Sequence, residues 1–243
     1  MKPVVAIASE FLDAFAQIPR AQQRKVREFT EKFRENPTSS AINYEKINMA
    51  RDDKVRTVRI GSDYRAVALH PEQGSIYMLL WVDHHDEAMA WARNRQFDIN
   101  PATGSLQIVN VVEAENVPPR KGKVKGLFAG VSDDELVSLG VPEILLPAVR
   151  AVAAAEALAS LRKHLPAEAA EALTWLAEGF EPDEVKEAIA APGKRKEIDT
   201  TDFAKALDHP DSRRRFVKVN SQHDLNAILN APLEKWRIFL HPT

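Results

Sequence analysis

A short stretch of the sequence, from Lys54 to His85, brings together side chains that could act on a phosphate group. In chain order they are Lys54, Arg56, Arg59, Arg65, Asp83, His84 and His85. Lysine and arginine are the usual partners of nucleic-acid phosphates, and histidine can accept or donate a proton near neutral pH. The stretch therefore predicts contact with nucleic acid, with acid–base chemistry as a further option.

Three strands would have to position these side chains. Residues 54–60, 64–70 and 75–82 are strand-like, and turn residues separate them. The pattern predicts a β-meander whose first two strands bring the three arginines close together. His84 and His85 follow the third strand. Because neighbouring strand residues point to opposite faces, at most one of them can face a shared site.

Further elements are predicted on both sides of the meander. They are helices over 7–17, 20–36 and 86–95 and a hairpin of 97–99 with 106–112. Ser9 is the expected N-cap of the first helix. The hairpin is expected to complete or extend the sheet.

The predicted order of elements, α-α-β-β-β-α, and two motifs resemble the RelE/ParE toxin superfamily over residues 5–96. The motifs are Val58-Arg-Ile-Gly-Ser-Asp-Tyr-Arg65 and the VDHHDEA run after the third strand. The resemblance implies a ribonuclease-like fold that, in active toxins, enters the ribosomal decoding site and cuts messenger RNA. By motif position, Arg59 and Arg65 would stabilise the phosphate and His85 would be the acid or base. Trp91 falls where many active members have a tyrosine, and tryptophan cannot act as a general acid.

Each of these residues also has a structural interpretation. Arg56 and Arg59 could face solvent on their strand, and Arg65 could form a surface pair with Asp63 or Asp86. The two histidines could be ordinary surface residues. A metal site is not expected, because the four consecutive residues of the DHHD run cannot easily converge on one ion.

Composition excludes several classes of function. The 243 residues contain no cysteine, which rules out disulfides, thiolate zinc sites and cysteine nucleophiles and fits a reducing cytoplasm. No apolar run approaches the length of a membrane span, so we expect neither export nor a membrane partner. The length allows two or three domains.

Charge is unevenly distributed, although the net charge is only −2. Residues 1–112 hold 15 Lys/Arg and 14 Asp/Glu, residues 131–192 hold 4 and 12, and residues 194–218 hold 8 and 5. Nucleic-acid binding usually leaves a basic face, so it is expected at 54–65, 120–125 and 194–218 and not in the acidic middle. Beyond the meander, the expected contacts are Lys121, Lys123, Arg213, Arg214 and Arg215.

The acidic middle has the pattern of a bundle of short helices over 131–193. Ser132 and Glu135 fit a capping box, and Pro142 and Pro166 each stand where a further helix would begin. Because acidic surfaces repel phosphates, we expect an interaction or spacer module that meets a protein partner. A basic linker over 113–130 precedes it.

The last segment predicts a strand after the three arginines and a helix from about Gln222 to Asn230. The ending Trp236-Arg-Ile-Phe-Leu-His-Pro242 resembles the segment before the adenine-reading glutamine and phosphate loop of UvrD-like superfamily 1 helicases that carry a RelE-like N-terminal domain. No G-x-x-x-x-G-K-[ST] motif is present, so we expect the chain to stop just before the motor. The resemblance implies ATP and Mg²⁺ for the parent helicase and no cofactor for these residues.

The predicted fold is α+β. It comprises a RelE-like domain with an antiparallel sheet and two N-terminal helices over 1–112, the linker 113–130, the all-α module 131–193, and a short α/β start of a helicase-like region over 194–243. The leading hypothesis is the non-motor N-terminal region of a UvrD-like DNA helicase, whose RelE-like domain docks nucleic acid, DNA rather than RNA, or protein. The alternative is a metal-independent RelE-type endoribonuclease using Arg59, Arg65 and His85. A third hypothesis is an antitoxin-like protein partner with no nucleic-acid role.

Overall fold

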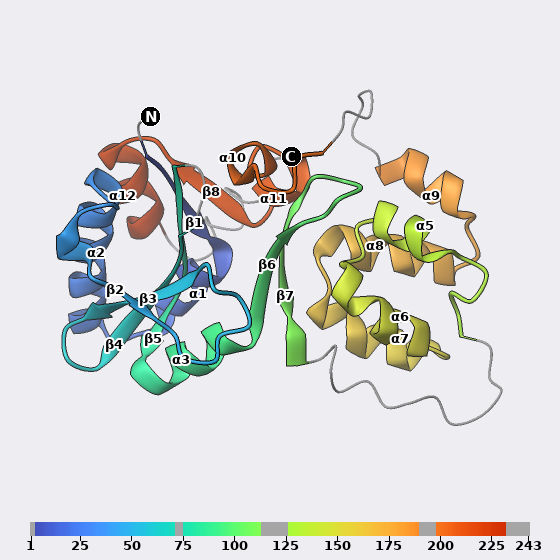
Figure 1. The fold of residues 1–243 in the computed structure, drawn as a ribbon, viewed down its shortest axis with the longest axis horizontal. Coiled ribbons are helices and arrows are strands. Elements are labelled where there is room, and N and C mark those ends of the chain that lie inside the picture. Colours follow the sequence, from blue (N-terminus) through green and yellow to red (C-terminus); the bar gives the residue numbers. More distant parts are fainter. Residues whose placement is uncertain (1–2, 71–74, 113–125, 190–197, 232–243) are drawn as a thin grey trace. The chain divides into compact units, whose positions relative to one another are not determined.

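The computed structural model describes residues 3–70, 75–112, 126–189 and 198–231 (Figure 1). Its fold is mixed α+β with a mostly antiparallel sheet, as predicted. Within these ranges, no helix combines the length and the apolar character that crossing a membrane requires.

The chain forms two compact units. Among the described residues, unit 1 contains 3–70, 75–94, 202–208 and 212–231, and unit 2 contains 95–112, 126–189, 198–201 and 209–211. The first unit boundary thus falls at residue 94, whereas the sequence suggested a domain boundary at 112.

Unit 1 is built on a six-stranded sheet in the order β2-β3-β4-β5-β1-β8 (Figure 1). The strands are β1 (Val4–Ala8), β2 (Tyr44–Lys46), β3 (Val55–Ile60), β4 (Tyr64–Leu69), β5 (Ile76–His84) and β8 (Phe216–Val219). β1 pairs with β5 in parallel, and all other neighbours are antiparallel. The predicted meander is confirmed as β3-β4-β5, and it carries the candidate residues.

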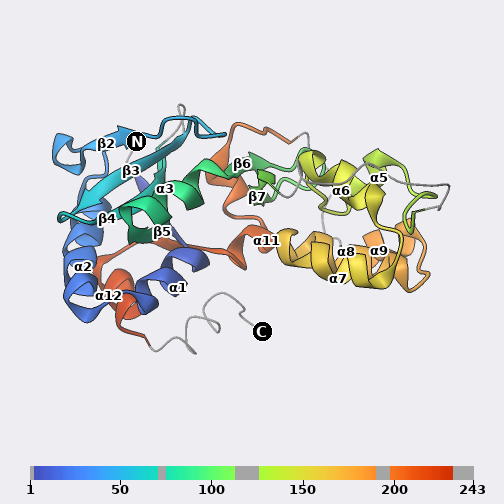
Figure 2. The same ribbon diagram turned by 90° about the horizontal axis from the view of Figure 1, so that it is seen from below.

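Helices enclose the core of unit 1. They are α1 (Ser9–Gln17), α2 (Arg20–Glu35), α3 (His85–Arg93), α10 (Phe203–Ala206) and α12 (Gln222–Asn230), with a 3-10 turn η1 at Ser40–Ile42. α2 buries Val26, Thr30 and Phe33, which lie on one face because they are spaced four and three residues apart. Residues of α1, α2 and α12 share one apolar core with alternate residues of the sheet, and Figure 2 shows α1 and α12 along the same side of it.

The N-terminal prediction was wrong in part. Val4–Ala8 form β1, in the interior of the sheet between β5 and β8, and the helix begins only at Ser9. Ala8 is the N-cap residue, and the Ser9 hydroxyl donates to Glu10 Oε2 at 2.9 Å. A short apolar strand buried on both faces shows no alternation, so its residues merged with the helical pattern that follows.

The strand and helix predicted near the C-terminus are confirmed as β8 and α12. Both belong to unit 1. β8 pairs with β1, with Val219 opposite Val5, and α12 contributes Leu225, Ile228 and Leu229 to the core of unit 1. The segment predicted to begin a helicase-like region therefore completes the sheet that the N-terminus starts.

Unit 2 begins with the hairpin of β6 (Arg95–Ile99) and β7 (Leu106–Asn110). The hairpin was predicted, but it forms a separate two-stranded sheet and does not extend the larger one. Its side chains bond to the helical part of unit 2: Asn100 Nδ2 donates to the Val137 carbonyl, and Gln107 Nε2 donates to that of Gly140. These bonds explain why the hairpin belongs with the helices.

Short helices form the rest of unit 2. They are α5 (Asp133–Ser138), α6 (Leu146–Ala151), α7 (Ala155–Leu161), α8 (Ala167–Ala177) and α9 (Pro182–Ile189), with 3-10 turns η2 (Glu143–Leu145) and η3 (Arg162–His164) and residues of α11 (Pro210–Arg213). The capping box of Ser132 and Glu135 is confirmed. Pro142 and Pro166 stand directly before η2 and α8.

Several predicted features lie outside the described residues, among them the turn at 71–74 and residues 194–197 of the basic segment 194–218. Residues 113–125 of the basic linker, with Lys121 and Lys123, also lie outside them. So does the Trp236–Pro242 ending that carries the helicase resemblance.

Candidate nucleic-acid interface

The β3–β4 hairpin brings Arg59 and Arg65 together. Gly61 adopts a φ of +65° in the turn, which glycine reaches without strain, and the register sets Arg59 directly opposite Arg65. Opposed residues of antiparallel strands share a face, where two like charges repel each other. A carboxylate is therefore expected nearby.

Glu45 of β2 supplies that carboxylate. Its Oε1 lies 3.7 Å from Arg59 Nη2 and its Oε2 lies 3.5 Å from Arg65 Nε. The side chain of Arg65 is 7% exposed and that of Arg59 is 60% exposed. The partner of Arg65 is thus Glu45, not Asp63 or Asp86. The site presents one outward-facing guanidinium beside a buried one.

Arg65 is incompletely satisfied in this position. Its Nη1 donates to the Tyr64 carbonyl at 3.0 Å, but its buried Nε makes no hydrogen bond within the described part of the chain. Glu45 Oε2, 3.5 Å away, pairs with the charge of Arg65 but forms no hydrogen bond with this N–H, which is unfavourable for a buried donor. Because this Nε is buried behind Glu45, a ligand oxygen would reach it only by displacing the Glu45 carboxylate, and would then gain a charge-assisted hydrogen bond.

Lys54 and Arg56 are held by the loop before β3. Lys54 Nζ pairs with the buried carboxylate of Asp52 at 3.0 Å. Arg56 Nη1 donates to the carbonyls of Asp53 and Val55. Arg56 and Arg59 are three positions apart on one strand and therefore point to opposite faces. The expected cluster of three arginines is reduced to two.

His84 and Tyr64 form a contact of their own. The Tyr64 hydroxyl lies 2.9 Å from His84 Nε2, and the ring centroids are 4.2 Å apart. Burial, together with the carboxylates of Asp83 and Asp63, raises the pKa of the Tyr64 hydroxyl. A tyrosine with a raised pKa keeps its proton, so the Tyr64 hydroxyl does not supply a base.

His85 is the first residue of α3 and lies at the same end of the sheet as Arg59 and Arg65. Its backbone N–H donates to the Asp63 carbonyl at 2.8 Å, and its Nδ1 lies 3.0 Å from Asp86 Oδ1. Trp91 of α3 is 8% exposed and stacks on Trp81, with ring centroids 5.3 Å apart. Where the resemblance called for a proton donor, the chain has an aromatic core residue.

A groove of about 420 Å³ opens beside Arg59, between α2 and β3. β2 begins at Tyr44, opposite Val58, so no strand covers β3 from Arg59 onward. The apolar lining residues of the groove include Phe29, Ile42, Val58 and Ile60, and the charged ones are Lys25, Lys32, Arg59, Glu28 and Glu35. Val58 and Ile60 face the core that α2 covers, so the Arg59 side chain leaves the strand on the other face, while Lys25 and Lys32 line the groove from the side of α2.

Sequence reasoning missed Lys25 and Lys32. The signal was present, because the 16 residues of α2 include six Lys/Arg and only three Glu. It was overlooked because a helix of mixed charge is ordinarily a solvated surface. Only the fold sets its basic side beside the Arg59 edge of the sheet.

The C-terminal arginines occupy three environments. Arg213 is exposed at the end of α11, and Arg214 is half-buried. Arg215 forms an ion pair with Glu10, whose Oε1 accepts from its Nε at 2.6 Å. Burial alone would raise the pKa of Glu10, but the Arg215 guanidinium lowers it below its usual value. Of the three, Arg213 is the outward-facing cation.

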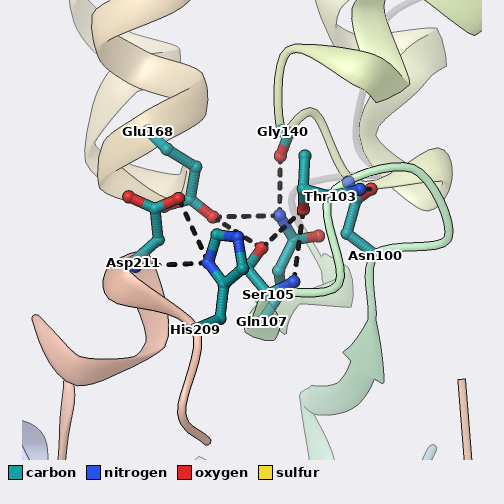
Figure 3. A network of polar contacts seen from close by, with 8 residues as sticks. All are labelled: Asn100, Thr103, Ser105, Gln107, Gly140, Glu168, His209 and Asp211. Atoms are coloured by element: carbon teal, nitrogen blue, oxygen red, sulfur yellow. Dashed lines mark hydrogen bonds and ion pairs between the residues drawn. The ribbon is translucent and has the colours of Figure 1, made fainter. Parts of the chain in front are cut away.

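Unit 2 holds a second cluster of polar groups, drawn in Figure 3. Glu168 of α8 is 8% exposed, and its Oε1 accepts hydrogen bonds from Ser105 Oγ and Gln107 Nε2, both at 3.2 Å. Gln107 also donates to the Gly140 carbonyl at 2.7 Å, and Ser105 Oγ lies 2.9 Å from Thr103 Oγ1. One glutamate thus joins the hairpin, the turn after α5 and α8.

His209 and Asp211 complete this cluster. His209 Nδ1 lies 3.4 Å from Asp211 Oδ2. Burial, with a contribution from the negative charge of Asp211, raises the pKa of Glu168, and burial lowers the pKa of His209 although Asp211 opposes that change. Over the described ranges no set of three His, Cys, Asp or Glu residues is arranged to hold a metal ion. Sequence reasoning selected none of these residues, because they come from four separate segments.

No family model matches the chain, and neither does a curated protein or a solved structure. The assignment of function therefore depends on the residues and the geometry given above.

Proposed function

We propose that unit 1 is a RelE/ParE-like docking module for nucleic acid that has no nuclease activity of its own. We further propose that the chain is the non-motor N-terminal region of a UvrD-like DNA helicase. The order β1, α1, α2, β2, β3, β4, β5, α3 supports the first proposal in part, since it contains the α-α-β-β-β-α order on which the resemblance was based and adds the strands β1 and β2 to it. ATP and Mg²⁺ would serve the motor of the parent protein.

One observation carries the binding role: the outward-facing Arg59 lies directly opposite the buried Arg65, with the two sharing the single carboxylate of Glu45. A phosphate could replace that carboxylate and accept from both guanidinium groups. Lys25 and Lys32 line the groove beside Arg59 from the side of α2 and would contact further phosphates of the bound nucleic acid. Contacts of this kind position a nucleic acid without reading its sequence.

The test measures binding of the full chain to labelled single-stranded and double-stranded DNA by fluorescence anisotropy over a range of salt concentrations. Arg59→Ala should weaken binding about tenfold at low salt and reduce the slope of log K against log salt by about 1. Lys32→Ala should act in the same direction. Lys163→Ala, which removes an exposed cation of unit 2, is the matched control and should leave binding unchanged.

Glu45→Gln sharpens this test. It removes the carboxylate that competes for both arginines, so binding should become tighter if they contact phosphate. A purely structural Arg59–Glu45–Arg65 cluster predicts no gain. Unchanged affinity in both Arg59→Ala and Glu45→Gln would overturn the docking role, and binding to RNA in place of DNA would overturn the choice of DNA.

An endoribonuclease remains the second candidate, because Arg59, Arg65 and His85 lie at the same end of the sheet. The buried Trp91 and the engaged side chains of His84 and His85 weigh against it. Expression separates the two candidates. Growth arrest that Arg65→Ala abolishes would indicate the nuclease, whereas harmless expression with intact messenger RNA would support the docking module. An antitoxin-like protein would show no salt-dependent binding to either nucleic acid.

A further inference from the structure

Two large aromatic side chains lie exposed on unit 2. Trp175 of α8 is 37% exposed and Phe180 is 50% exposed. Gly179, with a φ of +98°, ends the helix, and the Phe180 N–H donates to the Trp175 carbonyl at 3.1 Å. This turn sets the two rings 6.0 Å apart, so they form one aromatic patch, called here the Trp175–Phe180 patch.

The core of unit 2 does not need this patch. α8 buries Ala169, Ala172 and Leu173 against the other helices, and Trp175 is outside that set. A hydrophobic contact across such a helix-ending turn is common, but it does not require two large rings that both stay exposed. Exposed aromatic residues that cluster are typical of the anchors of protein–protein interfaces.

Carboxylates surround the patch. Glu178 and Glu181 flank the Gly179–Phe180 dipeptide, and both are exposed. Glu171 lies one helical turn before Trp175. Residues 131–192 as a whole hold 12 Asp/Glu against 4 Lys/Arg. This surface repels nucleic acid and anionic lipid and attracts cationic partners.

We propose that the Trp175–Phe180 patch docks a cationic amphipathic segment of a partner protein. Apolar side chains of that segment would pack on the two rings, and its Lys or Arg residues would face Glu178 and Glu181. The rings would provide most of the affinity, and the carboxylates would provide orientation and association rate. The inference is independent of nucleic-acid docking by unit 1, because it uses no residue of that unit.

The test uses the full chain and a fluorescently labelled helical peptide of Leu and Lys with its leucines on one face. Trp175→Ala and Phe180→Ala should each weaken binding about tenfold or more, and Glu178→Gln with Glu181→Gln should reduce its salt dependence. Leu127→Ala, which removes another exposed apolar side chain of unit 2, is the matched control. A peptide of the same composition with scattered leucines should bind more weakly than the amphipathic one.

Several outcomes would overturn the proposal. Binding that survives both aromatic substitutions, or that the scattered peptide matches, would show attraction by charge alone. Binding of phosphatidylcholine vesicles that Trp175→Ala abolishes would identify a lipid contact, and self-association that the same variant abolishes would identify a second copy as the occupant. Phe180→Ser provides a second probe if Trp175→Ala unfolds. If the aromatic variants still bind DNA normally, a failed peptide test concerns only the Trp175–Phe180 patch and leaves the proposed nucleic-acid docking by unit 1 untouched.

Discussion

The Arg59–Arg65 cluster of unit 1 and the Glu168 cluster of unit 2 differ in how their charged groups are paired. In unit 1, Arg59 and Arg65 share one carboxylate, and a buried guanidinium N–H of Arg65 makes no hydrogen bond among the described residues. In unit 2, Glu168 receives two hydrogen bonds from side chains that are themselves bonded, and its surroundings disfavour its charge. In the first cluster the Arg59 guanidinium stays in contact with solvent, whereas in the second the surroundings of Glu168 disfavour its ionised form. An incompletely satisfied cationic site suits ligand binding, and a satisfied buried network suits the joining of segments.

The largest effect on stability should come from adding a methyl group at Gly140, beside Glu168. In Gly140→Ala the new Cβ would stand 2.6 Å from Glu168 Cγ, at a φ of +93°. The clash and the backbone strain together should lower the free energy of unfolding of unit 2 by about 2–4 kcal/mol, measured by urea denaturation. Gly179→Ala has the strained φ but open space, and Gly130→Ala has open space and no positive φ. A loss in Gly140→Ala no larger than in Gly179→Ala would show that the network tolerates the added methyl group.

The next effect concerns the buried member of the arginine pair. Arg65→Ala removes a side chain that is 7% exposed and leaves Glu45 with one cation. Unit 1 should lose about 1–3 kcal/mol of stability, read from hydrogen exchange of the β4 amides. Arg65→Lys should recover part of it. An unchanged exchange rate would show that Arg65 is maintained for ligand binding alone.

Two glutamates should give pH dependences of opposite sign. The folded pKa of Glu168 is raised above the usual 4.5, so its contribution to stability is fully present below pH 4.5 and is lost as pH rises through the raised value. Glu168→Gln keeps the acceptor for Ser105 and Gln107 but cannot ionise. Hydrogen exchange of the α8 amides should therefore depend less on pH in this variant, and an unchanged dependence would contradict the assignment to Glu168.

Glu10 should behave in the reverse way. Its folded pKa lies below the usual 4.5 because of Arg215, so its contribution is present above pH 4.5 and is lost as pH falls through the lowered value. Glu10→Gln should flatten the acid limb of unfolding, followed at the amides of β1 and β8. If Glu10→Gln instead removed the pH dependence of the α8 amides, the acid-dependent loss of stability would have been assigned to the wrong unit.

The smallest effect on stability should come from Arg59→Ala. Its side chain is 60% exposed and its contact with Glu45 is 3.7 Å long, so the loss should not exceed about 1 kcal/mol by urea denaturation. The same variant should weaken DNA binding about tenfold. A large loss of stability with unchanged DNA binding would show that Arg59 is a structural residue and not a ligand-binding one.

Local sequence signals predicted the parts of the fold that depend on neighbouring residues. The meander, the capping box of Ser132 and Glu135, and the helix over 222–230 follow from turn residues, caps and periodicity. Val4–Ala8 was missed because a strand buried on both faces lacks alternation. The candidate site was half predicted, because the Gly61 turn makes Arg59 and Arg65 neighbours, but Glu45 pairs with them through a strand the pattern did not reveal.

By itself the sequence determined the types of side chain available, the uneven charge, and the pairing of residues that one turn brings together. Only the tertiary structure decided which distant segments meet. It placed β8 beside β1 and brought Ser105, Gln107, Gly140, Glu168, His209 and Asp211 into one network. The physical reason is that buried polar groups must find partners wherever the chain folds back, and such partners leave no regular spacing in the sequence.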